Sequence, residues 1–256
     1  MKRAIYNFVA VPWREQQRLQ REFVNRADAD RPDWQVIWVT VTAAVIMTLQ
    51  YYGCISGRFL YDTFVPAAVE GPWTRQIHWA ASQTLLYTLI PWCTVRFALR
   101  RPIGQYGLSV RGIGASAWIY LAMYLVMVPA ILWFSGSARF QQTYPFYHPP
   151  AGEPVWPKLI VWELLYAVQF VALEFFFRGY LVHGLKHRFG PYAIFAAMVP
   201  YCMIHFGKPL PETLGAIVAG IVLGFMSLKT KSIWLGAALH IAVAWTMDAA
   251  AIWMRL

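Results

Sequence analysis

Seven apolar stretches of 16 to 26 residues occur along this chain of 256 residues. A segment of about 20 apolar residues can cross the hydrocarbon core of a bilayer as a helix. The sequence therefore predicts an all-α fold, a polytopic membrane bundle of about seven transmembrane helices. The expected spans are residues 34–54, 76–98, 116–134, 158–183, 191–206, 213–229 and 233–254.

The composition agrees with a chain that has little aqueous surface. Charged residues make up 13% of the sequence and hydrophobic residues 59%, whereas a soluble domain carries about a quarter charged residues. The net charge of +10 comes from short clusters between the apolar stretches. Because no basic stripe is interleaved with aromatic residues, nucleic acid is not an expected partner.

The distribution of Lys and Arg predicts the orientation. The arm at residues 1–33 carries seven of them, and this arm with every second connection carries 15, against six on the opposite side. The positive-inside rule places the basic side, and with it the N-terminus, in the cytoplasm of a multi-pass protein of the cell membrane. The arm is expected to be an interfacial helix or a solvated tail. Residues 34–256 are expected to form a single transmembrane domain.

Ionisable residues inside the expected spans are concentrated in the C-terminal part, at residues 158–254. An ionisable group at bilayer depth is costly unless it is paired or hydrated, so each one is a candidate functional residue. The first three spans contain almost no ionisable residue beyond His78, which lies near one end. We therefore expect a scaffold in the first half and a functional site in the second. The candidates are Glu163, Glu174, Arg178, His183, His205, His240 and Asp248.

Glu174 and Arg178 are four residues apart on one expected helix, so they share a face and can form an ion pair. Glu163 lies about 16 Å away along the same helix and is expected nearer the outer interface. His183 and His187 have a spacing that can hold zinc. At about 100° per residue, however, His183 points away from Glu174, and both histidines are expected to complement the charge of a helix end.

His205 ends the fifth span and His240 lies about one third of the way into the seventh. One acidic residue with two histidines is the smallest set that can bind a divalent metal and activate water. The same set suffices for metal-free hydrolysis, with the glutamate as base and histidine stabilising the oxyanion. Both mechanisms remain open at this level.

Three segments together resemble a known family. They are Leu173-Glu174-Phe175-Phe176-Phe177-Arg178-Gly179, Tyr201-Cys202-Met203-Ile204-His205, and His240 about 35 residues after His205. In this order they are similar to the motifs of the CAAX-protease and bacteriocin-processing (CPBP, or Abi) family of intramembrane endopeptidases. The resemblance covers residues 158–254 and implies a helical bundle with a polar centre that cleaves peptide bonds in or near the membrane.

The resemblance also implies residue roles. Glu174 and Arg178 fall on the family's E-x-x-x-R pattern, His205 on the histidine that follows an aromatic residue by four, and His240 on the last motif. Two positions depart from the pattern. Leu173 stands where the family usually has the first of two glutamates, which activates water, and Ala244 stands where the last motif has a polar residue. Asp248 or Glu212 are candidates to replace a missing polar group.

The sequence therefore predicts an endopeptidase that cleaves membrane-associated or lipid-modified peptides, with Glu174, His205, His240 and Arg178 in its site. One zinc ion held by His205 and His240 is the candidate cofactor, beside the metal-free mechanism. A catalytically inactive scaffold or peptide-binding protein of the same fold is the main alternative. A small proton-coupled transporter is another, which the absence of repeat symmetry disfavours. The expected partners are the bilayer and a membrane-anchored peptide or protein substrate; no oligomeric state is predicted.

Small residues recur every four positions on the sixth span, at Ala216, Gly220 and Gly224. Such a face lets two helices approach closely in a membrane. We expect it to pack against another helix of the same chain rather than to form a dimer.

Overall fold

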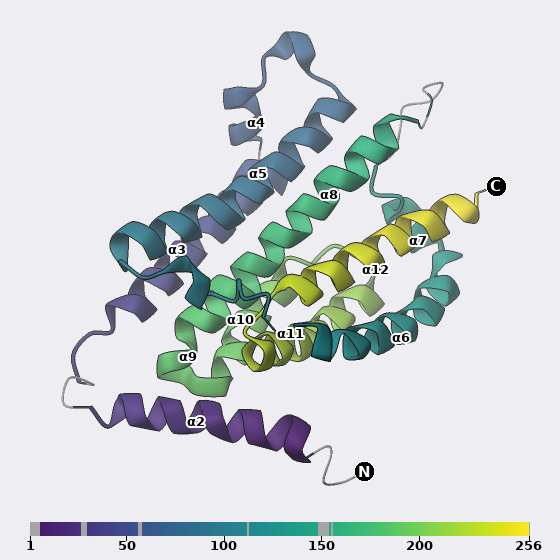
Figure 1. Cartoon of the computed structure of the whole chain (residues 1–256). Helices are drawn as coiled ribbons and strands as arrows, with labels where there is room; N and C mark the ends of the chain where they lie inside the picture. Colours follow the sequence, from purple (N-terminus) through teal and green to yellow (C-terminus); the bar gives the residue numbers. More distant parts are fainter. Residues whose placement is uncertain are drawn as a thin grey trace. The chain divides into compact units, whose positions relative to one another are not determined.

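The computed structural model describes residues 6–26, 30–55, 58–111, 113–147, 154 and 156–255. Nearly all of the regular structure is helical, and the described residues form no strand. Figure 1 shows the order of the elements along the chain. The α-helices are α2 (Val11–Val24), α3 (Trp34–Gln50), α4 (Phe59–Phe64), α5 (Pro72–Cys93), α6 (Ala117–Ser135), α7 (Ala138–Thr143), α8 (Lys158–Glu174), α9 (Gly184–Phe189), α10 (Ala193–Met203), α11 (Leu210–Thr230) and α12 (Trp234–Trp253).

Shorter helical segments of other types extend or connect these helices. Four are π-helical: η1 (Tyr6–Ala10), η2 (Tyr51–Ile55), η4 (Thr94–Ala98) and η7 (Phe175–His183). The other four are 3₁₀ turns: η3 (Ala67–Val69), η5 (Ile103–Gln105), η6 (Ile113–Ser116) and η8 (Gly190–Tyr192). The N-terminal arm is therefore helical over η1 and α2, whereas its place at the membrane stays a prediction.

Among the described residues, five helical segments are long and apolar enough to cross a membrane. They are Trp34–Cys54, Ile113–Ser135, Lys158–Met203, Leu210–Thr230 and Trp234–Trp253. The all-α membrane fold is confirmed, but the count of seven is not. The expected span 76–98 falls on α5 and η4, which are not among the five. The expected span 158–183 and most of the span 191–206 fall on one uninterrupted run of helical residues, Lys158–Met203, which contains α8, η7, α9, η8 and α10.

The chain divides into two compact units, which are described separately. The first unit contains Met1–Ala44, Ile90–Arg111 and Phe175–Ile233. The second contains Val45–Leu89, Gly112–Glu174 and Trp234–Leu256.

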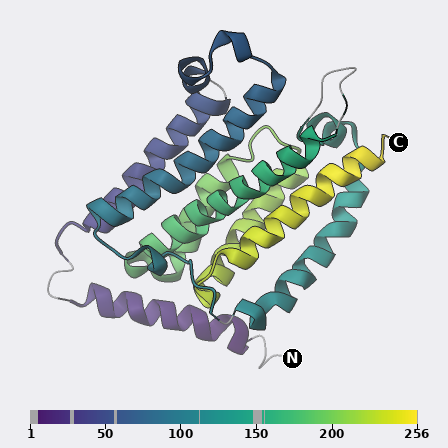
Figure 2. The same ribbon diagram turned by 45° about the horizontal axis from the view of Figure 1, so that its top comes forward.

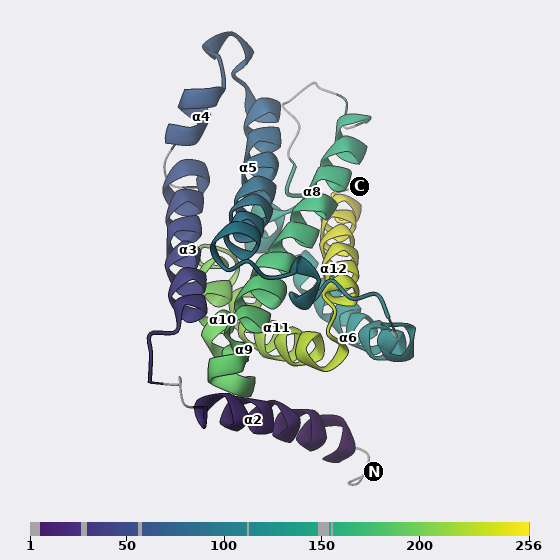
Figure 3. The ribbon, with the colours of Figure 1, turned by 60° about the vertical axis from the view of Figure 1, so that its left-hand side comes forward.

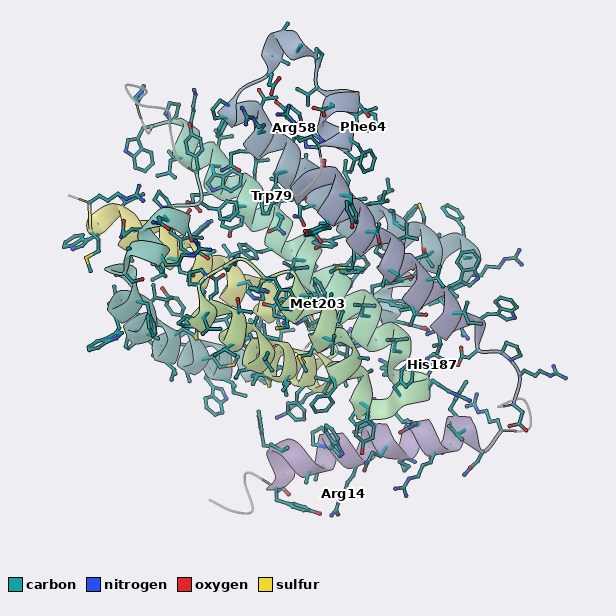
Figure 4. All side chains as sticks on the ribbon, turned by 180° about the vertical axis from the view of Figure 1, so that it is seen from behind. Arg14, Arg58, Phe64, Trp79, His187 and Met203 are labelled. Carbon is teal, nitrogen blue, oxygen red and sulfur yellow. The ribbon has the colours of Figure 1, made fainter. Side chains whose placement is uncertain are left out.

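In the first unit the chain reverses direction at η8, and α10 then packs against η7 and α11. A run of cations followed by Gly190 and Pro191 is typical of the end of a helix, and α9 ends here. Gly190 has φ +56° and ψ −135°, a conformation that a residue with a side chain rarely adopts. Helix α2 packs against α9 and η8 (Figures 1 and 3). Gln20 of α2 donates a hydrogen bond of 3.1 Å to the Arg188 carbonyl.

The α10–α11 contact in the first unit uses the small residues of α11. A Cβ atom added to Gly220 would lie 2.8 Å from Cγ of Met198, and one added to Gly224 would lie 2.9 Å from Cγ2 of Ile194. Ala216 is buried on the same helix. The small residues thus allow close packing inside the chain, as the sequence predicts.

In the second unit, α12 lies between α6 and α8, as Figure 2 shows in yellow, teal and green. Its buried core is aromatic, with Trp162 and Tyr166 of α8 packed around Phe146. Phe146 belongs to the long connection expected at residues 135–157, which includes α7. Residues 148–153 and 155 of that connection, with the run His148-Pro149-Pro150, lie outside the described residues.

Candidate functional site

Glu174 and His240 meet inside the second unit. Glu174 is the last residue of α8, and His240 lies on the facing helix α12. Nδ1 of His240 lies 2.9 Å from Oε1 of Glu174, with side chains 15% and 1% exposed. The distance is that of an ion pair, although the ring N–H is not aligned as a hydrogen bond. Two of the residues that the sequence singles out, 66 positions apart, are thus brought together by α8–α12 packing.

An aromatic stack supports His240 on one side. The Phe170 ring lies 5.5 Å from the imidazole with an interplanar angle of 12°, so the two rings are stacked. Tyr166 contacts Phe170 in turn, with 4.5 Å between ring centroids. Sequence analysis did not single out Phe170. Its position one turn before Glu174, on the same expected helix, is the only signal that could have identified it.

The two departures from the family pattern are buried and apolar. Leu173 is 5% exposed on α8 and Ala244 is 5% exposed on α12. Neither side chain has a group that can donate or accept a hydrogen bond. In this chain the polar atoms of the second unit's candidate site therefore come from Glu174 and His240.

Arg178, in the first unit, is held by α10 and α11. It is 2% exposed, and its guanidinium carbon lies 3.9 Å from the centroid of the Tyr201 ring. Its Nη2 donates a hydrogen bond of 3.4 Å to the carbonyl of Ala219. A planar guanidinium is suited to stacking on an aromatic face. Arg178 thus fixes the position of Tyr201.

Tyr201 in turn holds His205. Nδ1 of His205 lies 2.8 Å from the Tyr201 carbonyl oxygen, and the two rings meet edge to face at 4.8 Å. Because a carbonyl oxygen only accepts hydrogen bonds, Nδ1 of His205 carries the hydrogen. In the neutral ring, Nε2 then carries the lone pair, which can accept a proton from water or bind a metal.

The π-helix η7 changes the angles between side chains from those of an α-helix. It begins at Phe175, directly after Glu174, and contains Arg178 and His183. Hydrogen bonds from i to i+5 widen the helix, so each residue turns through less than the 100° of an α-helix. The expectation that His183 points opposite Glu174 rested on α-helical geometry, which does not hold here. A π-helical turn inside a helix is frequent at functional sites.

His183 lies in the last turn of η7 and His187 in the last turn of α9, as expected, and both also make contacts beyond the helix end. His183 is buried, with Nε2 3.0 Å from the Ser227 hydroxyl and Nδ1 2.9 Å from Nζ of Lys186. His187 contacts Asp33 at 2.8 Å and packs edge to face on Phe23 of α2. Both histidines therefore make tertiary contacts within the first unit.

Asp248, a candidate for the missing polar group, is 1% exposed in the second unit. Its two carboxylate oxygens accept hydrogen bonds of 3.1 and 3.2 Å from the backbone N–H of Phe146. Asp248 also lies close to the carboxyl group of Glu163 on α8. These contacts attach the connection before α8 to α12.

Glu212, the other candidate, lies in the first turn of α11. Its Oε1 accepts a hydrogen bond of 2.6 Å from Nζ of Lys208. A carboxylate in the first turn complements the helix dipole. The structure thus places Glu212 at the N-terminus of α11, paired with Lys208.

Few of the described side chains lie close enough together to bind a metal ion jointly. Among the residues that the structure describes, no three His, Cys, Asp or Glu side chains gather as metal ligands would. A catalytic zinc site normally has three protein ligands. These residues therefore do not form a zinc site of the usual kind, and zinc bound by His205 and His240 stays a prediction.

A comparison with protein families agrees with the motif order. Residues 154–246 match the family model described as type II CAAX prenyl endopeptidase Rce1-like. The match covers 93 residues and includes Glu174, Arg178, His205 and His240, whereas Asp248 lies just beyond it. No curated protein and no solved structure matches the chain. The chain is a multi-pass membrane protein whose residues 154–246 are similar to the Rce1-like type II CAAX prenyl endopeptidases, which is consistent with the CPBP family.

Proposed function

We propose that this protein is an active intramembrane endopeptidase that hydrolyses membrane-anchored or lipid-modified peptides with water activated by Glu174. The observation that carries the proposal is the 2.9 Å contact between Glu174 and His240 in a nearly inaccessible position. A carboxylate beside an imidazole in a buried site is an arrangement used for proton transfer. The motif order supports assigning both residues to peptide hydrolysis.

The proposed step is a proton transfer coupled to attack on the peptide carbonyl. The Glu174 carboxylate takes one proton from water, and the water oxygen forms a bond with the carbonyl carbon. When the carbon–nitrogen bond breaks, Glu174 gives this proton to the leaving amine. His240, beside the carboxylate, keeps Glu174 oriented and, when protonated, compensates its charge.

His205 is assigned to the same reaction by the family resemblance. With Nδ1–H bound to the Tyr201 carbonyl, its neutral ring offers Nε2 as an acceptor. In this tautomer Nε2 is an acceptor. His205 is therefore better suited to binding and orienting the water than to donating a hydrogen bond to an oxyanion. Arg178 acts through Tyr201 and is a positioning residue. A divalent metal on His205 and His240 would polarise the carbonyl or the water.

The main competing function is an inactive scaffold or peptide-binding protein. Two replacements favour the inactive protein. Leu173 and Ala244 are buried apolar side chains at positions where the family pattern has polar residues. The Glu174–His240 contact favours activity instead, since placing two ionisable groups together in a buried position of a membrane protein has a cost. The two functions differ in whether any peptide is cleaved.

Cleavage by purified protein tests the proposal. The wild type, Glu174→Gln and His205→Ala are incubated with membrane-anchored and prenylated peptides in lipid nanodiscs, and the products are identified by mass spectrometry. We expect wild-type cleavage and a loss of about 10² to 10⁴-fold in Glu174→Gln, as for removal of a general base. Full cleavage by Glu174→Gln would remove Glu174 as the base, and no cleavage of any peptide by wild type would favour the scaffold.

The same assay with a chelator tests the metal. Loss of cleavage with chelator and its recovery with zinc would support a metal on His205 and His240. Unchanged cleavage would support the metal-free mechanism, with the same residues in their proposed roles.

A further inference from the structure

A cavity of about 190 Å³ lies in the first unit, between α2 and the C-terminal end of α11. Trp13, Ile194 and Phe225 form apolar walls, and Lys229, Lys231 and Glu15 contribute charged groups. The membrane-length segment Leu210–Thr230 ends between the two lysines. The cavity, here named the α2–α11 cavity, therefore lies where a transmembrane helix leaves the hydrocarbon.

The charges around this cavity are mostly positive. Lys229 and Lys231 line it, and Lys186 of α9 lies near Lys231, outside the lining. None of the described carboxylates lies within ion-pair distance of Lys186, Lys229 or Lys231. A helix C-terminus favours cations, which accounts for Lys229 on α11. It does not compensate the repulsion between lysines from two different helices, which a bound anion would relieve.

The aromatic walls fit the polar–apolar boundary of a bilayer. Nζ of Lys229 lies 3.0 Å from the centroid of the Phe8 ring, and Phe8 contacts Phe225 at 6.1 Å. Trp13 meets Tyr192 edge to face at 5.6 Å. Aromatic rings of this kind settle at headgroup level. One wall can thus contact the glycerol and upper acyl carbons of a lipid while the lysines face its phosphate.

We propose that the α2–α11 cavity binds the phosphate of an anionic membrane phospholipid. Lys229 and Lys231 contact the phosphate, and the apolar walls contact the glycerol region. Basic pockets between transmembrane helices bind anionic headgroups in this way. The bound lipid joins α2 to α11 within the first unit.

Thermal unfolding of the full-length protein in a neutral detergent tests this proposal. Phosphatidylglycerol, phosphatidylcholine or inorganic phosphate is titrated, and the rise in Tm is recorded. We expect phosphatidylglycerol to raise Tm at the lowest concentration, because only a ligand of the folded state stabilises it. The double variant Lys229→Gln/Lys231→Gln should need at least ten times more of this lipid for half of the effect.

The matched control is Arg18→Gln/Arg21→Gln, which removes two positive charges from the exposed face of α2 outside the cavity. It should respond like the wild type. An equal response of the Lys229/Lys231 variant, an equal loss in the control, or equal effects of phosphatidylcholine or inorganic phosphate would each overturn the proposal. If the double variant does not fold, Lys231→Gln alone, at an exposed position, serves in its place.

Discussion

Glu174 and Leu173 are neighbours on α8 that are both buried, yet they have different expected roles. The leucine side chain can only pack, whereas the carboxylate lies against His240. Sequence motifs identified Glu174, His205 and His240 because ionisable groups are conspicuous in apolar spans. The motifs did not predict that Arg178 stacks on Tyr201. The position of Arg178 four residues after Glu174 indicated only an ion pair between those two side chains.

Leu173→Ala tests the division of roles between these neighbours. Removing a buried leucine side chain leaves a cavity and should destabilise the protein by about 2 kcal/mol or more. Activity per folded molecule should stay within about threefold, because the base is retained. Thermal unfolding and cleavage rates of the same preparation check both values. A hundredfold loss of kcat in a folded Leu173→Ala variant would assign Leu173 a direct part in the reaction.

Arg178→Lys tests the positioning of His205. Lysine keeps the charge but loses the flat guanidinium that stacks at 3.9 Å on Tyr201. We expect kcat to fall about tenfold with KM nearly unchanged, since a small displacement of His205 affects the reacting geometry.

Tyr201→Phe is the control for this change, because it keeps both the ring and the backbone carbonyl that binds His205. It should retain near-wild-type kcat. A rise in KM without a change in kcat in Arg178→Lys would instead indicate that Arg178 binds the substrate.

At the scale of helices, apolar length predicted nearly every boundary. The expected spans 116–134, 213–229 and 233–254 differ by a few residues at most from α6, α11 and α12. The π-helical turns could not be predicted, because the i to i+5 pattern depends on how neighbouring helices constrain the backbone. The contact of α8 with α12 is likewise a tertiary feature that spacing along the chain does not specify.

Gly224→Ala tests the close contact of α10 and α11. The new Cβ would lie 2.9 Å from Cγ2 of Ile194, a stiff and buried side chain, so one helix must shift. We expect a destabilisation of about 1 to 3 kcal/mol, as for overpacking. Gly215→Ala on the same helix meets no atom within 4 Å and should be neutral or slightly stabilising. Equal unfolding temperatures for the two variants would contradict this account of the interface.

For the molecule as a whole, the bias of Lys and Arg predicts membrane sidedness. We expect the N-terminal arm to be cytoplasmic and the connection between α4 and α5 to be outside. Single cysteines at Glu22 and Ala68, in a variant without Cys54, Cys93 and Cys202, can be treated with a membrane-impermeant thiol reagent. Glu22→Cys should react only after the membrane is opened, and Ala68→Cys in intact cells. The reverse pattern would invert the topology.

The central claim is that Glu174 and His240 act as one catalytic pair. A double-mutant cycle tests it, with kcat measured for the wild type, Glu174→Gln, His240→Ala and the double variant on one membrane-anchored peptide. Residues that act as a unit give non-additive losses. We predict that the double variant is about as slow as the slower single variant. Losses that multiply in the double variant, or a single variant with wild-type kcat, would contradict the claim.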